Sequence, residues 1–191
     1  MKKVLLVLFL FANSNCFSQT IESLKEGTKK MYEATYNMVF EDVINNSYPK
    51  IFDFATREEM MTMLTSSFEN ETLKIRFVYP DPVFTFSEIK IVDGKHACII
   101  TYNNAMRMTF NEPFTDEKAL QTEESFNDTG GYKTVRFEKD RNSFFLENQS
   151  MVIAIADEST KFEWKFATYD KSQNEIMKKI IGESIFNALG L

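Results

Sequence analysis

The residues best suited to chemistry lie on one predicted strand, where a histidine shares a face with a cysteine and a tyrosine. His96 is the chain's only histidine, and alternation along residues 95–102 puts His96, Cys98 and Tyr102 on the same side. If that side lines an apolar pocket, His96 is a candidate general base and Tyr102 a hydrogen-bond donor. Alternatively, His96 starts the strand beside the Asp93-Gly94 turn and lies in solvent, which is the interpretation we favour.

Neither a nucleophile nor a metal site follows from this pattern. Side chains two residues apart on a strand stand about 6.5–7 Å apart, so His96 is too distant to activate Cys98, which we expect to be a small core residue. A single histidine cannot supply the pair found in common zinc and iron sites. Adjacent acidic residues such as Glu123-Glu124 are typical of hydrated surface, and residues 127–131 lack the spacing of a calcium loop. We expect no catalytic residue, no metal and no cofactor.

Helical spacing of apolar residues predicts three helices. The first covers residues 20–43 and is broken by residues 45–49, which include Pro49. The second begins at Thr56, where Thr56 and Glu59 form a capping-box pair, and ends near residue 70. The third runs from a similar Ser172–Glu175 pair to a C-cap glycine, Gly190.

Period-two alternation between the second and third helices predicts a meander of antiparallel strands. The predicted strands cover residues 73–79, 83–92, 95–102, 105–110, 132–137, 143–147, 151–156 and 161–169. Asp93-Gly94 and residues 139–142 are predicted hairpin turns. Residues 111–128 form an acidic excursion in which Thr115 can cap a short helix. The last strand points Phe162, Trp164 and Phe166 inward.

Helices followed by a long antiparallel meander predict an α+β fold, with helices packed on one face of a curved antiparallel sheet and an extra C-terminal helix. In this order of elements the chain resembles the NTF2-like superfamily, the cone-shaped fold shared with SnoaL-type and ketosteroid-isomerase-type domains. The resemblance is carried by the long first helix, the Tyr48-Pro49-Lys50-Ile51-Phe52 stretch and the Trp164-Lys165-Phe166 strand, and it covers residues 20–169. It implies a cone whose interior is a pocket.

We expect that pocket to hold a small apolar ligand. Its predicted lining is five residues from the inward faces of the strands: His96, Tyr102, Met106, Trp164 and Phe166. The more conservative interpretation is that the methionines and Trp164 fill the core, because core and pocket wall overlap in a cone.

The N-terminus predicts export. Lys2 and Lys3, an apolar stretch from Val4 to Ala12 and a short polar end form the three parts of a secretory signal peptide. We expect cleavage after residue 18, leaving residues 19–191 as one domain in the periplasm or outside the cell. A lipid anchor on Cys16 is the minority alternative. The apolar stretch is too short for a transmembrane helix, which needs about 20 residues.

The charge composition limits the kinds of partner that the protein can bind. The chain carries 22 basic and 28 acidic residues, a net charge of −6, which repels nucleic acid. We expect an exported, non-catalytic binding or accessory protein. The alternatives are a protein-interaction module, such as a homodimer or an inhibitor of an exported protein partner that uses the sheet face, and an isomerase- or hydratase-type enzyme with a pocket carboxylate.

Overall fold

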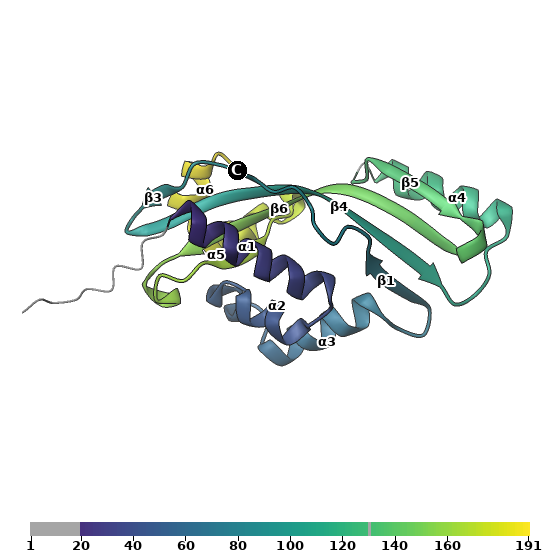
Figure 1. Ribbon diagram of the computed structural model, residues 1–191, viewed down its shortest axis with the longest axis horizontal. Coiled ribbons are helices and arrows are strands. Elements are labelled where there is room, and N and C mark those ends of the chain that lie inside the picture. Colours follow the sequence, from purple (N-terminus) through teal and green to yellow (C-terminus); the bar gives the residue numbers. More distant parts are fainter. Residues whose placement is uncertain (1–19, 130) are drawn as a thin grey trace, which may run out of the picture.

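The computed structural model describes residues 20–129 and 131–191, and over these ranges the chain has an α+β fold (Figure 1). A seven-stranded antiparallel sheet is accompanied by six α-helices within the described residues. The α+β prediction is confirmed. The predicted signal peptide, residues 1–18, lies outside the described residues.

Two long strands form the centre of the sheet. β4 (Lys95–Phe110) and β6 (Ser143–Ala156) pair in antiparallel register from His96–Ala156 to Thr109–Ser143. Shorter strands line their outer edges: β1 (Leu73–Phe77), β2 (Thr85–Phe86) and β3 (Lys90–Val92) along β4, and β5 (Thr134–Glu138) and β7 (Lys165–Thr168) along β6. Long continuous pairing of β4 with β6 therefore gives the molecule its length.

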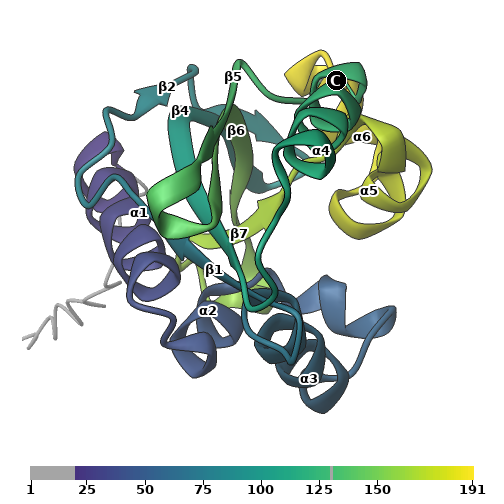
Figure 2. The same ribbon diagram turned by 90° about the vertical axis from the view of Figure 1, so that its right-hand side faces the viewer.

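Helices cover both faces of one end of this sheet, so the expectation of helices on one face was wrong. α1 (Ile21–Tyr36) packs on one face against Cys98, Ile100 and Val152. On the other face, α5 (Asn174–Ile181) and α6 (Glu183–Leu189) pack against Ala97, Ile153 and Ile155. Figure 2, a view along the long axis, shows α1 and the α5–α6 pair on opposite sides of the strands.

A third apolar cluster stabilises the far end. α4 (Asp116–Asp128) and β5 lie there, away from α1, α5 and α6 (Figure 1). Phe144 and Leu146 are fully buried in this cluster, and the rings of Phe114, Phe126 and Phe137 pack around Phe144. The abundance of phenylalanine in the sequence is used here to cover the end of the long strand pair.

The helices differ from their predicted bounds at their ends. Residues 20–43 form two helices, α1 and α2 (Phe40–Asn46), because Met38 takes a left-handed conformation with φ of 57°. α3 (Arg57–Phe68) has the predicted Thr56–Glu59 capping box. The predicted C-terminal helix is split by Gly182, whose φ of 94° ends α5, and Gly190 caps α6 as predicted. Ser172 and Glu175 form no capping box, because Asp170 accepts the Ser172 N–H instead.

The strands differ more from their predicted bounds than the helices do. The Asp93-Gly94 hairpin is confirmed, with φ of 51° and 75°, and Thr115 caps α4 as predicted. The predicted breaks after residue 102 and after residue 147 were wrong, since β4 and β6 run straight through both. Residues 83–92 contain two short strands in place of one.

The last strand is shorter than predicted. Trp164 and Phe166 are buried, but Phe162 is 41 % exposed and has a φ of 58°, so its predicted inward position was wrong.

Candidate binding cleft

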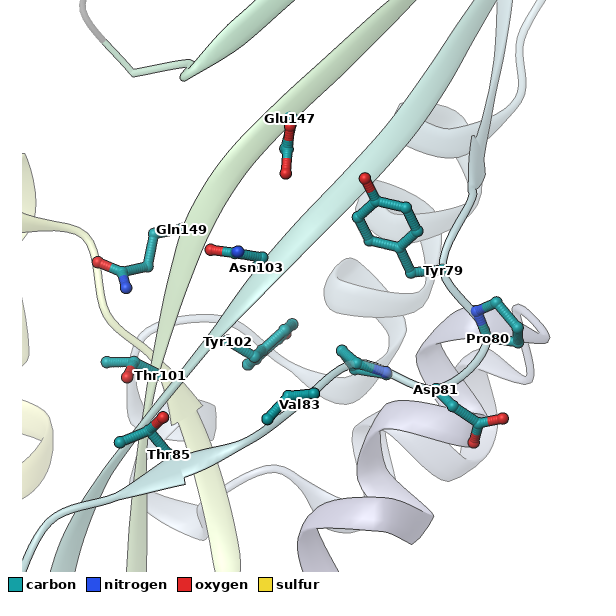
Figure 3. Close-up of a pocket in the computed structure, with 11 residues that line it drawn as sticks. Tyr79, Pro80, Asp81, Val83, Thr85, Thr101, Tyr102, Asn103, Glu147 and Gln149 are labelled. Carbon is teal, nitrogen blue, oxygen red and sulfur yellow. The ribbon is translucent and has the colours of Figure 1, made fainter.

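A polar cleft of about 610 Å³ lies over the centre of the sheet (Figure 3). Its floor is on the sheet face that packs against α5 and α6. That packing includes Ala97 and Ile153, and alternation along the strands puts Thr101, Asn103 and Gln149 on the same side. The apolar cover therefore gives way to a hydrogen-bonding surface halfway along β4 and β6.

The register of the sheet determines which side chains lie next to one another on the floor of the cleft. Asn103 lies directly opposite Gln149, Thr101 lies opposite Thr85 of β2, and Glu147 is two residues before Gln149 on β6. Glu147 Oε2 accepts a hydrogen bond of 3.1 Å from the hydroxyl of Thr134 on β5, which orients its carboxylate. These side chains are held by strands and not by loops, so their spacing is set before any ligand binds.

A proline-containing loop from Tyr79 to Val83 forms the wall, running along the outer edge of β4 between β1 and β2. Pro80 and Pro82 restrict its backbone. The Tyr32 hydroxyl of α1 donates a hydrogen bond of 2.5 Å to the Tyr79 carbonyl. Burial raises the pKa of Tyr32 well above its usual range, so this hydroxyl keeps its proton at neutral pH. The wall is thus anchored to α1, while Val83 at its far end is 86 % exposed.

The charge of the cleft is negative. Glu147 contributes a carboxylate to the floor, Asp81 lies in the wall with its carboxylate directed away from the floor (Figure 3), and none of the described lining residues is a lysine, arginine or histidine. The remaining polar groups are the carboxamides of Asn103 and Gln149 and the hydroxyls of threonines and tyrosines. Such a set can hold a polar ligand through many hydrogen bonds and repels an anion.

A second, smaller cleft of about 320 Å³ lies on the opposite side of the same loop. It shares Pro80, Asp81 and Pro82 with the first. Its other lining residues are Lys25, Lys29, Tyr32 and Glu33 of α1, together with Phe84 and Phe86. The loop therefore separates a polar cleft on one face of the sheet from a more apolar one beside α1.

The predicted pocket residues lie on the α1 face of the sheet. Tyr102, Trp164 and Phe166 are brought together in the α1 cluster, where Trp164 Nε1 donates to Ser23 Oγ at 3.1 Å. Met106 is separated from them and packs against the α4 cluster. Tyr102 alone among the five also lines the polar cleft, and burial raises the pKa of its phenol.

His96 and Cys98 also point toward the α1 face, as the alternation predicted. His96 is half-buried, so the favoured expectation that it lies in solvent is not met; within the described residues its buried Nδ1 has no hydrogen-bond partner. Cys98 is fully buried, and this burial raises the pKa of its thiol, so it is not poised as a nucleophile. Residues 20–129 and 131–191 contain no group of three or more His, Cys, Asp or Glu side chains placed to hold a metal.

A buried carboxylate–tyrosine pair occurs elsewhere and has a structural explanation. Tyr48 donates a 2.7 Å hydrogen bond to Asp157 Oδ2, and Asp157 Oδ1 accepts from Ser159 Oγ and Thr160 N. Asp157 caps the short 3-10 helix Glu158–Thr160 in this way. Each carboxylate oxygen is already hydrogen-bonded within the chain, so the pair ties two segments together and none of its atoms lines the polar cleft.

Sequence reasoning missed the floor of the cleft. Asn103 was assigned to a break in the strand, which hid its alternation with Thr101. Gln149 was likewise left outside any strand, because one predicted strand ended at residue 147 and the next began at residue 151. Reading residues 95–110 as one strand would have put Thr101 and Asn103 together on one face, with Ile100 and Tyr102 on the other.

A scan of protein-family models finds none that matches this chain, and a search of curated proteins finds no significant relative. Over the described residues, no helix has the length and apolar character to cross a membrane.

Proposed function

We propose that this chain is an exported, non-catalytic binding protein that holds a small polar ligand in the cleft between β4, β6 and the Tyr79–Val83 loop. The observation that carries the proposal is the composition of the cleft. Carboxamides and hydroxyls on rigid strands face a loop anchored to α1, a combination typical of binding sites that are formed before the ligand arrives.

The apolar ligand expected from the sequence is less well supported. It would occupy the space between α1 and the sheet, where Tyr102, Trp164 and Phe166 pack with Leu24 and Met31. A Cβ added at Gly27 of α1 would lie 3.4 Å from the Phe166 ring, so the helix approaches the sheet closely there. The proposal therefore moves the ligand to the opposite face.

The chain offers a direct test. A thermal-shift screen of the exported protein would include neutral sugars, amines, amino acids and fatty acids. We expect a polar compound to raise the Tm, and the double variant Asn103→Ala/Gln149→Ala to abolish that rise. The matched control is Gln121→Ala, which removes an exposed amide from α4, far from the cleft. A rise that survives in the double variant, or one produced only by fatty acids, would contradict the proposal.

A protein-interaction role is the second candidate, and a different part of the same face favours it. Beyond the cleft, Arg107, Phe145 and Arg136 are neighbours in the sheet register, with Arg136 stacked 5.0 Å from the Phe145 ring centre. Aromatic and arginine side chains are enriched at protein interfaces. If this surface forms a homodimer, Phe145→Glu will convert a dimer to a monomer in analytical ultracentrifugation.

A further inference from the structure

We propose that the ligand of the polar cleft is a neutral saccharide, bound as one or a few pyranose units. This rests on the proposed function, because it names the chemical class that the same cleft recognises. Three features of the cleft support the assignment: its balance of donors and acceptors, the spacing of its floor, and its pairing of a polar floor with an apolar wall.

The hydrogen-bonding groups suit a polyol. Each sugar hydroxyl donates one hydrogen bond and accepts others, so its site needs both kinds of group. The carboxamides of Asn103 and Gln149 each carry two N–H donors and an acceptor oxygen, and the Thr85 and Thr101 hydroxyls act in either sense. The Glu147 carboxylate adds acceptor sites, one of which Thr134 uses. A carboxylate can accept from two adjacent hydroxyls at once.

The centre of the floor has the dimensions of a sugar ring, and the whole floor is longer. Asn103 and Gln149 are directly opposed across the strands, a separation of about 5 Å between Cβ atoms. Thr101 and Glu147 lie two residues along their strands, about 7 Å from Asn103 and Gln149 respectively. Because the strands are antiparallel, Thr101 and Glu147 lie on opposite sides of the Asn103–Gln149 pair. A pyranose over that pair can direct hydroxyls on two edges of its ring at Asn103 and Gln149, and further units of the saccharide would extend toward Thr101 or Glu147.

The wall suits the C–H faces of the ring. Figure 3 shows the Tyr79 ring and Val83, both from the loop, standing across the cleft from Asn103 and Gln149 of the sheet. Pro80 and Pro82 add further apolar surface, and Val83 is almost fully exposed. A sugar between the floor and this wall hydrogen-bonds through its edges while it covers aromatic and aliphatic surface with its C–H groups.

The charge of the cleft indicates that the saccharide is neutral. The Glu147 carboxylate on the floor, the nearby charge of Asp81 and the absence of a cationic side chain among the described lining residues disfavour sulfated, phosphorylated or uronic sugars. A polyamine would satisfy the carboxylates but would leave the acceptor oxygens and donors of Asn103 and Gln149 without a specific role. These two chemistries make different predictions and can be separated.

The test is an array of neutral and acidic oligosaccharides probed with the exported protein, followed by calorimetry with each sugar retained and with spermidine. We expect a neutral di- to tetrasaccharide to bind, and its sulfated form to bind at least 10-fold more weakly. Asn103→Ala, Gln149→Ala and Tyr79→Ala should each lower the affinity at least 10-fold, while Gln121→Ala leaves it unchanged. Asn103 and Gln149 are exposed, so their substitutions leave the core intact, which circular dichroism will verify.

The other outcomes are decisive in different ways. Binding of spermidine with no binding of neutral sugars, lost in Glu147→Gln, would overturn the saccharide and leave the cleft as the binding site. Sugar binding that all three cleft variants retain would place the site elsewhere and overturn the saccharide assignment. No binding of any probe on the array, in calorimetry or in the thermal-shift screen would overturn both proposals.

Discussion

Replacing Tyr48 by phenylalanine will measure how strongly the buried Asp157 carboxylate ties two distant segments together. Tyr48 is fully buried and Asp157 is 4 % exposed, so water cannot replace the lost hydroxyl. The change removes the 2.7 Å hydrogen bond to Oδ2 and leaves the ring in place. A hydrogen bond to a charged group contributes about 1.5–3 kcal/mol, so we expect a loss of about 2 kcal/mol. For a domain of this size that corresponds to a fall in Tm of roughly 4–8 °C.

The loss should depend on pH. Burial opposes ionisation of Asp157, but the hydrogen bonds from Ser159, Tyr48 and Thr160 outweigh it and lower the pKa of the carboxyl. A lowered native pKa means that the carboxylate stabilises the fold above the unfolded pKa of about 3.9, and that this contribution is lost as pH falls through the lower native value. The difference between wild type and Tyr48→Phe should therefore shrink below about pH 4.

Urea unfolding followed by circular dichroism at pH 7 and at acid pH measures both effects. The matched control is Tyr169→Phe, whose hydroxyl donates to the neutral Asn174 amide at 2.9 Å. Its cost should be about 1 kcal/mol and the same at both pH values. A loss below about 0.5 kcal/mol for Tyr48→Phe at pH 7 would refute the reasoning, since that is the range of ordinary surface changes. An undiminished loss at acid pH would show that the charge of Asp157 is not involved.

Three further predictions follow from local geometry. Asn142→Ala should cost about 2–3 kcal/mol and speed amide exchange in α4, since Asn142 has a φ of 48° and bonds Phe114 N, Phe110 O and Glu112 O. Normal exchange in α4 would contradict this. Gly94→Ala should cost about 1–2 kcal/mol in urea unfolding through its φ of 75° alone, because an added Cβ meets no atom within 4 Å. Cys98 should resist iodoacetamide in the folded protein and react after unfolding, because it is fully buried; fast labelling of the folded protein would show that this strand opens.

Local features of this chain were predictable because they depend on neighbouring residues. The Thr56–Glu59 capping box, the Thr115 cap, the Asp93-Gly94 turn and the Gly190 C-cap were each recognised from a few adjacent side chains. The α+β class followed from the change between helical and period-two spacing. In these cases the backbone energetics of a short segment are enough to choose its conformation.

Strand continuity was decided by tertiary structure. Asn103-Asn104 resembles a turn, and asparagine favours turns when isolated. In the folded chain these residues continue β4, because Asn103 and Asn104 pair with Gln149 and Asn148 of β6. The backbone hydrogen bonds of two long strands outweigh the local preference of two residues. The same pairing makes residues 148–150 part of β6, although the sequence predicted a break between two strands there.

The cleft shows where sequence stops being sufficient. Alternation determines that Thr101 and Asn103 share a face opposite Ile100 and Tyr102, and this much is fixed by the geometry of any strand. Which face receives α1, which receives α5 and α6, and where that apolar cover ends depend on packing between segments that are distant in the sequence. Only the tertiary structure places Gln149 opposite Asn103 and the Tyr79–Val83 loop across from both, because cross-strand register is a long-range property of the whole sheet.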